Sequence, residues 1–214
     1  SDSFYILWGT CACTSSNSHP FVIPLKNNLS SLYLELHDNE KAKIYNSHAK
    51  ELKDASIASC DVFIGEEKKW CAEQDEVYIL ILNNLVLIQF LQGNKEEAEQ
   101  ILAMAYSQAI ELRKIQRSHQ DYETAFFTLL MTSSLLNDFF GRKDTALRTL
   151  KICEDLREKS YSSKHPDMLQ IKINTAKLLA EQRNYKKAYS IMNELISNSK
   201  AEYTHFSSIP MGIL

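Results

Sequence analysis

The chain has 214 residues, of which 44% are hydrophobic and 24% charged, a composition typical of a globular protein with a sizeable core. Its 24 basic and 27 acidic residues give a formal net charge of -3. They form no basic stripe of the kind that nucleic-acid-binding proteins carry. The chain contains only five glycines and four prolines, too few for an all-β fold or a glycine-rich phosphate loop. We therefore expect helices joined by short turns.

The cysteines and the hydropathy of the chain indicate the compartment in which the protein is expected. The five cysteines are Cys11, Cys13, Cys60, Cys71 and Cys153. Their number is odd and no pair has CxxC spacing, which favours a reducing compartment over a disulfide framework. The first residues, SDSFYILWGTCACTSS, are partly apolar but have no basic leader, so we predict no signal peptide. No apolar run is long enough for a membrane span. We expect an intracellular protein, in the cytoplasm or the nucleus.

In chain order, residues 1–18 are predicted to form a flanking or capping helix, and a repeat domain follows over residues 19–198. Its repeats are expected at about 19–58, 75–116, 120–159 and 165–198. Each has an apolar-periodic helix, a tight polar turn and a second helix. Between the first two repeats, the insert SIASCDVFIGEEKKWCAEQDE is expected to lengthen the second helix of the first repeat or to form a loop. Residues 199–214 are expected to be a tail or the start of a further helix.

Small residues keep the repeats in register. An alanine lies near the start of each second helix, at Ala42, Ala98, Ala146 and Ala188. Gly93 and Gly141 each lie five residues before such an alanine. A small residue lets two helices approach closely, and glycine ends a helix in the left-handed conformation without a Cβ clash. One hairpin cannot cover its own apolar stripe, so the repeats must stack.

The turn patterns GNKEEAE (93–99), GRKDTAL (141–147) and RNYKKAY (183–189) resemble those of tetratricopeptide (TPR) repeats. With LNNL (82–85) and KHPD (164–167), the longer unit is most similar to kinesin-light-chain-like repeats. The resemblance implies an all-α, right-handed α-solenoid of about four helix-turn-helix repeats with flanking helices. One departure is His37, which stands where glycine is expected.

In a solenoid of this family, the first helices line the concave face where partners bind. Asn28, Asn84 and Asn174 fall at one equivalent position of these helices. A side-chain amide both donates and accepts hydrogen bonds, so it could hold a peptide backbone. The alternative is that each amide satisfies a nearby helix carbonyl or faces water. The predicted partner-binding groove comprises Asn27, Asn28, Asn83, Asn84, Leu87, Phe90, Leu91, Met131, Leu135, Phe139, Asn174 and Lys177.

The floor of this groove is predicted to be apolar, and Leu80 is expected to lie there as well. An exposed apolar patch marks a binding site, unless a flanking helix, the tail or a neighbouring repeat covers it. The first helices carry few cations, namely Lys26, Lys172 and Lys177. That disfavours the basic clamp with which chaperone-binding relatives hold a C-terminal carboxylate.

We predict no catalytic residue, metal site or cofactor. The six histidines are scattered, and His19 and His165 are interpreted as residues at helix starts. The predicted function is a non-catalytic scaffold or adaptor for a peptide or helix of another protein. Two alternatives remain open: a structural subunit of a permanent complex, with self-association through the solenoid ends, and a peptide-gated regulator.

Overall fold

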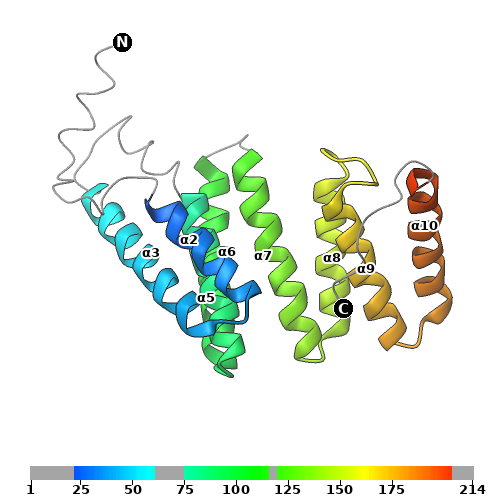
Figure 1. Ribbon diagram of the computed structural model, residues 1–214, viewed down its shortest axis with the longest axis horizontal. Coiled ribbons are helices and arrows are strands. Elements are labelled where there is room, and N and C mark those ends of the chain that lie inside the picture. Colours follow the sequence, from blue (N-terminus) through cyan, green and yellow to red (C-terminus); the bar gives the residue numbers. More distant parts are fainter. Residues whose placement is uncertain (1–21, 61–74, 116–119, 204–214) are drawn as a thin grey trace, which may run out of the picture. The chain divides into compact units, whose positions relative to one another are not determined.

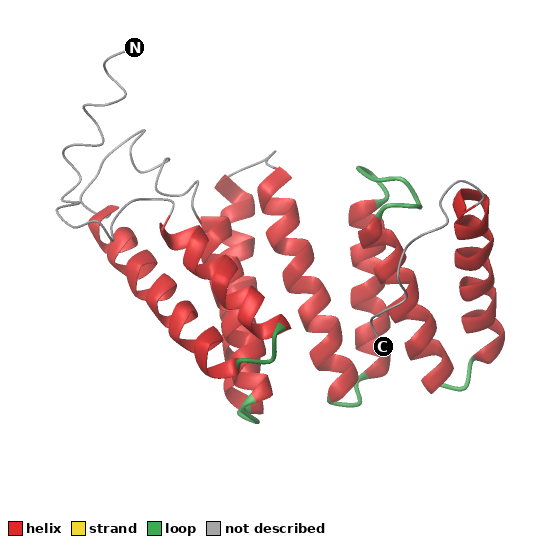
Figure 2. Ribbon diagram, in the orientation of Figure 1, coloured by secondary structure: helices red, strands yellow, loops and turns green. Residues whose placement is uncertain are grey.

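The computed structural model describes residues 22–60, 75–115 and 120–203, and within them the chain forms helices and turns without any strand (Figures 1 and 2). The predicted helix over residues 1–18, residues 61–74 of the insert and the tail beyond Tyr203 lie outside the described residues. None of the described helices is long and apolar enough to span a membrane. The prediction of an all-α protein is confirmed.

The helices follow one another in pairs, each joined by a short turn. The pairs are α2 (Val22–Glu35) with α3 (Asn39–Cys60), α5 (Asp75–Leu91) with α6 (Lys95–Ile115), α7 (Gln120–Phe139) with α8 (Lys143–Arg157), and α9 (Pro166–Glu181) with α10 (Tyr185–Tyr203). We number these pairs as repeats one to four. Their first helices are α2, α5, α7 and α9, and their second helices are α3, α6, α8 and α10.

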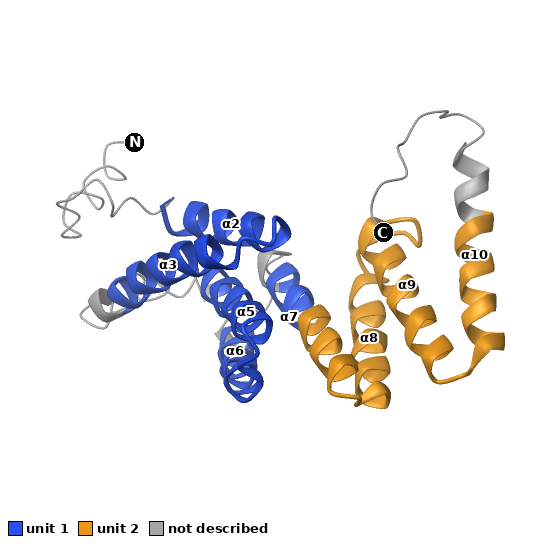
Figure 3. Ribbon diagram, turned by 60° about the horizontal axis from the view of Figure 1, so that its bottom comes forward, with its two compact units in different colours: residues 1–129 blue, residues 130–214 orange. Residues whose placement is uncertain are grey.

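The chain divides into two compact units, residues 1–129 and 130–214, with the boundary inside α7 (Figure 3). In the first unit, α2 packs against α3 and α5, α3 also packs against α5, and α5 packs against α6. In the second unit, α9 packs against both α8 and α10. Second helices thus contact the first helix of the following repeat, as expected for stacked helix pairs.

The turn within each repeat has the same backbone conformation. Its central residue is His37, Gly93, Gly141 or Arg183, with φ of 58°, 85°, 74° and 62° respectively. All four residues lie in the left-handed region, which an L-residue with a Cβ adopts only at a cost. The equivalence expected between His37 and the turn glycines is therefore present in the backbone.

The hydrogen bonds of these turns also repeat. The Gly93 amide donates to the Phe90 carbonyl at 3.0 Å, and the Asn94 amide donates to the Gln89 carbonyl at 2.9 Å. This pair of bonds is the Schellman motif, which satisfies carbonyls at a helix end. The other three turns have the same two bonds, from His37 and Asp38, from Gly141 and Arg142, and from Arg183 and Asn184.

The repeat alanine near the start of each second helix lies where the two helices of the pair meet. Ala42, Ala98 and Ala146 are fully buried. In repeats one and three, a serine on the first helix donates to the carbonyl of that alanine: Ser30 Oγ to Ala42 at 2.9 Å and Ser134 Oγ to Ala146 at 3.2 Å. This contact requires the two helices to approach closely, which is the role predicted for the alanines.

Candidate protein-binding surface

Three of the predicted groove asparagines are buried: Asn27, Asn83 and Asn84. The Nδ2 of Asn84 donates to Asn27 Oδ1 at 2.9 Å and to Ser31 Oγ at 2.9 Å, and it lies 3.3 Å from the Asn27 carbonyl oxygen. These bonds join α5 to α2, the first helices of consecutive repeats. The donors of Asn84 are therefore used inside the fold, in agreement with the alternative in which the amide satisfies a neighbouring helix.

The two other asparagines at this repeat position have different surroundings. Asn28 is exposed on α2, whereas Asn174 is half-buried on α9 and accepts a hydrogen bond from Gln170 Nε2 at 3.0 Å. With Asn84 buried, the three amides do not form an exposed row along the first helices. The side-chain amides of Asn28 and Asn174 are the ones within reach of a partner.

The predicted apolar floor is partly exposed. Leu91 is 50% exposed on α5, and Leu135 and Phe139 are 49% and 57% exposed on α7. The neighbouring groove residues Leu80, Leu87, Phe90 and Met131 are half-buried. Exposed leucine and phenylalanine side chains on successive turns of α7 form an apolar surface of the kind that protein partners cover.

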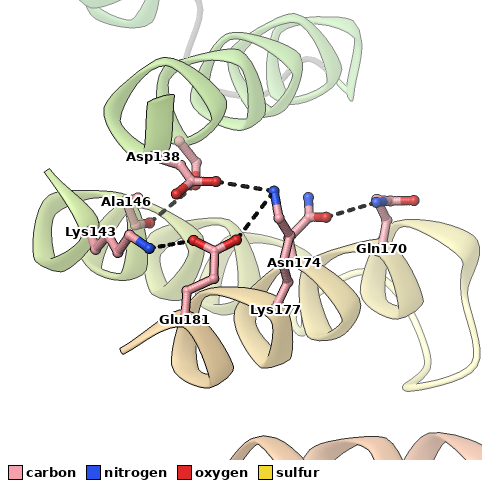
Figure 4. Close-up of polar contacts among 8 residues, drawn as sticks. Asp138, Lys143, Ala146, Gln170, Asn174, Lys177 and Glu181 are labelled. Atoms are coloured by element: carbon pink, nitrogen blue, oxygen red, sulfur yellow. Dashed lines mark hydrogen bonds and ion pairs between the residues drawn. The ribbon is translucent and has the colours of Figure 1, made fainter. Parts of the chain in front are cut away.

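Lys177 lies beside this surface within a small network of charges (Figure 4). Its Nζ is 3.2 Å from Asp138 Oδ2 at the end of α7 and 3.8 Å from Glu181 Oε1 on its own helix. Glu181 also pairs with Lys143 at the start of α8. The hydrogen bond from Lys143 lowers the pKa of the Glu181 carboxyl below its ordinary value. The charge of Lys177 is therefore balanced within the second unit.

The KHPD segment, residues 164–167, connects α8 to α9. His165 is the N-cap of α9, where its Nδ1 accepts from the Asp167 amide at 3.2 Å, and Pro166 occupies the first helical position. The Nε of Arg157, whose side chain is 2% exposed, is 3.1 Å from Asp167 Oδ2. Its guanidinium also lies 5.0 Å from the Tyr161 ring centroid. The interpretation of His165 as a helix-start residue is confirmed, whereas the buried Arg157 pair was not predicted.

No group of three or more potential metal ligands occurs among the described residues. Cys153 is a free thiol, fully buried on α8, and burial raises its pKa to about 12. It therefore stays protonated and packs as a small apolar side chain, as predicted for the cysteines. Cys11, Cys13 and Cys71 lie outside the described residues, as does the side chain of Cys60.

Comparisons with known proteins identify the fold. No protein-family model matches the sequence, and a search of curated proteins found no match. The structure is similar to the crystal structure of BtubC (BKLC) from P. vanneervenii, with a TM-score of 0.62 and 16% sequence identity, over 100% of this chain and 77% of that one. BtubC is a kinesin light chain-like protein of TPR type. A likeness at this identity shows the fold alone, so the chain has a TPR-like helical-repeat fold.

Proposed function

We propose that this chain is a non-catalytic protein-interaction scaffold or adaptor, which binds a peptide or helix of another protein on its first helices. The observation that carries the proposal is the exposure of Leu91, Leu135 and Phe139, each about half exposed on a first helix. Exposed apolar side chains are costly to leave in water. Binding of a partner that covers them is therefore stabilised by the free energy of their burial.

Apolar residues occupy two equivalent positions of the first helices in repeats two and three. Leu135 and Phe139 lie eleven and seven residues before Ala146, as Leu87 and Leu91 do before Ala98. The corresponding residues of repeats one and four are polar: Ser31 and Glu35, and Lys177 and Glu181. Within the second unit, this pattern supports a ligand whose apolar side chains meet Leu135 and Phe139 of α7 and whose polar side chains meet Lys177 and Glu181 of α9.

The charge network supports an apolar rather than an acidic ligand. Lys177 is the one cation of the predicted groove, and it already pairs with Asp138 and Glu181. An anionic ligand would have to displace these carboxylates, which lowers its net gain. The proposed binding mode is therefore packing of apolar side chains on α7, with orientation supplied by the amide of Asn174 in the same unit.

We further propose an intracellular location. The free, buried thiol of Cys153 supports a reducing environment, in which thiols persist. A second candidate function, a structural subunit of a permanent complex, is supported by apolar side chains exposed on the first and last described helices, such as Leu25 and Tyr189.

The test begins with peptides selected from a random displayed library against the purified full chain. The selected peptides are expected to be rich in apolar residues. Leu135→Ser and Phe139→Ser should each weaken their binding at least about tenfold, because each removes roughly 1.5 kcal/mol or more of apolar burial. Ile152→Ser is the matched control, since Ile152 is 52% exposed on the second helix α8.

The choice of variant matters because Asn84→Ala would remove hydrogen bonds between repeats, so a loss of binding there could reflect unfolding. Folding of each variant is checked by circular dichroism and thermal melting. Selected peptides whose affinity is unchanged by both α7 substitutions, or is lowered equally by Ile152→Ser, would overturn the proposed surface.

A further inference from the structure

The first turn of α9 is capped by an imidazole. His165 precedes the helix with an extended backbone, with φ of -61° and ψ of 140°, and its Nδ1 accepts a hydrogen bond from the Asp167 amide at 3.2 Å. That amide is one of the donors at a helix start that have no partner within the helix. The usual cap residues are serine, threonine, aspartate and asparagine, whose side-chain oxygens accept this bond. A histidine cap differs from them because its acceptor takes up a proton under mildly acidic conditions.

The cap hydrogen bond determines which protonation state the folded turn requires. Nδ1 accepts only when it carries no proton, so the ring is neutral and its proton is on Nε2. The imidazolium ion donates from both nitrogens and accepts at neither. Protonation would therefore place an N–H of His165 against the N–H of Asp167, and the cap would be lost.

The imidazole is held in place by contacts with α8 and with the turn that follows it. Its ring lies on the Tyr161 ring, with centroids 3.9 Å apart and an interplanar angle of 28°. The guanidinium of Arg157 lies 5.0 Å from the centroid of the same tyrosine ring. The His165 amide also donates to the Ser162 carbonyl at 3.0 Å. These contacts hold both the ring and the backbone of His165 in the position of the cap.

The charged groups around the imidazole have opposing effects on its protonation. Arg157 of α8, Lys164 of the turn and the positive end of the α9 dipole disfavour another positive charge. The Asp167 carboxylate favours it, since its Oδ2 lies 3.9 Å from Nδ1. On the side of α10, Glu194 pairs with Lys172, two turns into α9. Asp167 Oδ2 is 3.1 Å from the Nε of Arg157, so the carboxylate that could compensate an imidazolium is already engaged.

The cap lies at the joint between repeats three and four. α8 packs against α9, and Arg157, which is 2% exposed, has Asp167 in the first turn of α9 as an ion-pair partner. The Leu169 amide donates to the His165 carbonyl at 3.0 Å, which begins the backbone ladder of α9. A first turn that loses its cap frays, and fraying withdraws the Asp167 carboxylate from Arg157. One proton on His165 therefore acts on both the helix start and the joint.

We propose that His165 is a proton-sensitive cap, which holds the first turn of α9 at neutral pH and releases it below about pH 6, loosening the joint between repeats three and four. The folded chain requires the neutral ring, whereas the unfolded chain accepts either form. The unfolded state therefore binds more protons over this range, so the free energy of unfolding falls as the pH falls. The proposal is independent of the peptide-binding surface on α7.

Urea denaturation of the full chain at about pH 8 and about pH 5 tests the cap, because these values lie on either side of the range in which histidine titrates. His165→Asn keeps a cap whose acceptor does not titrate, and His165→Ala removes the cap at every pH. At the higher pH, the wild type and His165→Asn should have similar equilibrium constants of unfolding. That of His165→Ala should be about fivefold larger, as expected for the loss of a cap.

At the lower pH, the wild type should behave like the alanine variant. Its equilibrium constant of unfolding, relative to that of His165→Asn, should rise by about fivefold. The chain has six histidines, and the others are common to all three proteins, so their titration cancels in this comparison. Circular dichroism at both pH values confirms that each variant is folded.

Nitrogen NMR of the wild type gives a readout that needs no substitution. At the higher pH, the His165 ring should show an unprotonated Nδ1 and a protonated Nε2. As the ring takes up its second proton, the Asp167 amide resonance should shift and its protection from hydrogen exchange should fall. The amide of Asn174, in the middle of the same helix, is the internal control and should show no such change.

The opposite results would overturn the proposal. If the ratio between the wild type and His165→Asn stayed constant with pH, the neutral ring would not be what holds the turn. A wild type that gains stability relative to His165→Asn at the lower pH would show that the imidazolium pairs with the Asp167 carboxylate instead. An Nδ1 that carries the proton at the higher pH would exclude the cap hydrogen bond itself.

Discussion

At the scale of single residues, the turns show that one backbone conformation accepts different side chains at different cost. Gly93 and Gly141 adopt the left-handed conformation freely, whereas His37 and Arg183 adopt it with a Cβ. Two of the four turns thus carry local strain, and the Schellman hydrogen bonds hold them in place.

We expect His37→Gly and Arg183→Gly each to stabilise the protein by about 0.5–1 kcal/mol, because relief of left-handed strain outweighs the added freedom of the unfolded chain. Urea denaturation measures the change. Gly93→Ala is the opposite control: an added Cβ meets no atom within 4 Å, so its expected loss of about 1 kcal/mol comes from backbone strain alone. Lower stability in both glycine variants would contradict the left-handed turns.

At the scale of elements, polar contacts set how consecutive repeats join. In the first unit, Asn84 connects α5 to α2 through Asn27 and Ser31. In the second, Arg157 at the end of α8 pairs with Asp167 in the first turn of α9. A buried guanidinium depends on its counter-ion, because an unpaired charge in a low-dielectric site is costly.

Asp167→Asn is expected to lower the free energy of unfolding by about 2 kcal/mol. The value lies below that of a fully buried pair because Asp167 is 29% exposed. Chemical denaturation checks it, with Lys151→Ala as control: Lys151 forms only exposed pairs on α8, and its loss should be under about 0.5 kcal/mol. The double variant Arg157→Met, Asp167→Asn should recover much of the lost stability, because it removes the buried charge together with its partner. If Asp167→Asn and Lys151→Ala lowered the free energy of unfolding equally, the proposed role of the Arg157–Asp167 pair would be contradicted.

At the scale of the whole molecule, stability in repeat proteins comes from each repeat and from its contacts with neighbours. Repeats one and four each have a neighbour on one side among the described residues, and their outer faces are apolar and exposed, as Leu25 and Met192 show. These end repeats should open more readily than the inner ones.

Hydrogen exchange tests this gradient. At low concentration, amides of α2 and α10 should exchange at least about tenfold faster than those of α5 and α8, because they lack one interface worth more than 1.4 kcal/mol. Equal exchange rates in the end helices and the inner helices would contradict this gradient.

The sequence by itself determined the helices and the turns, because both depend on interactions within a few residues. Apolar periodicity, the alanines and the turn glycines sufficed to predict an all-α protein of helix pairs, and His165 was predictable as a helix-start residue. His37 and Arg183 share the turn conformation without glycine because neighbouring hydrogen bonds impose it.

Only the tertiary structure decided which side chains are covered, because exposure depends on helices distant in sequence. Leu25 and Leu129 occupy the same repeat position, yet Leu25 is 58% exposed and Leu129 is fully buried. Asn28 and Asn84 are likewise equivalent in the sequence, but α2 supplies hydrogen-bond acceptors to Asn84 alone. The repeat pattern could therefore predict the positions of a candidate surface but not their burial, since burial is set by whether another repeat lies alongside.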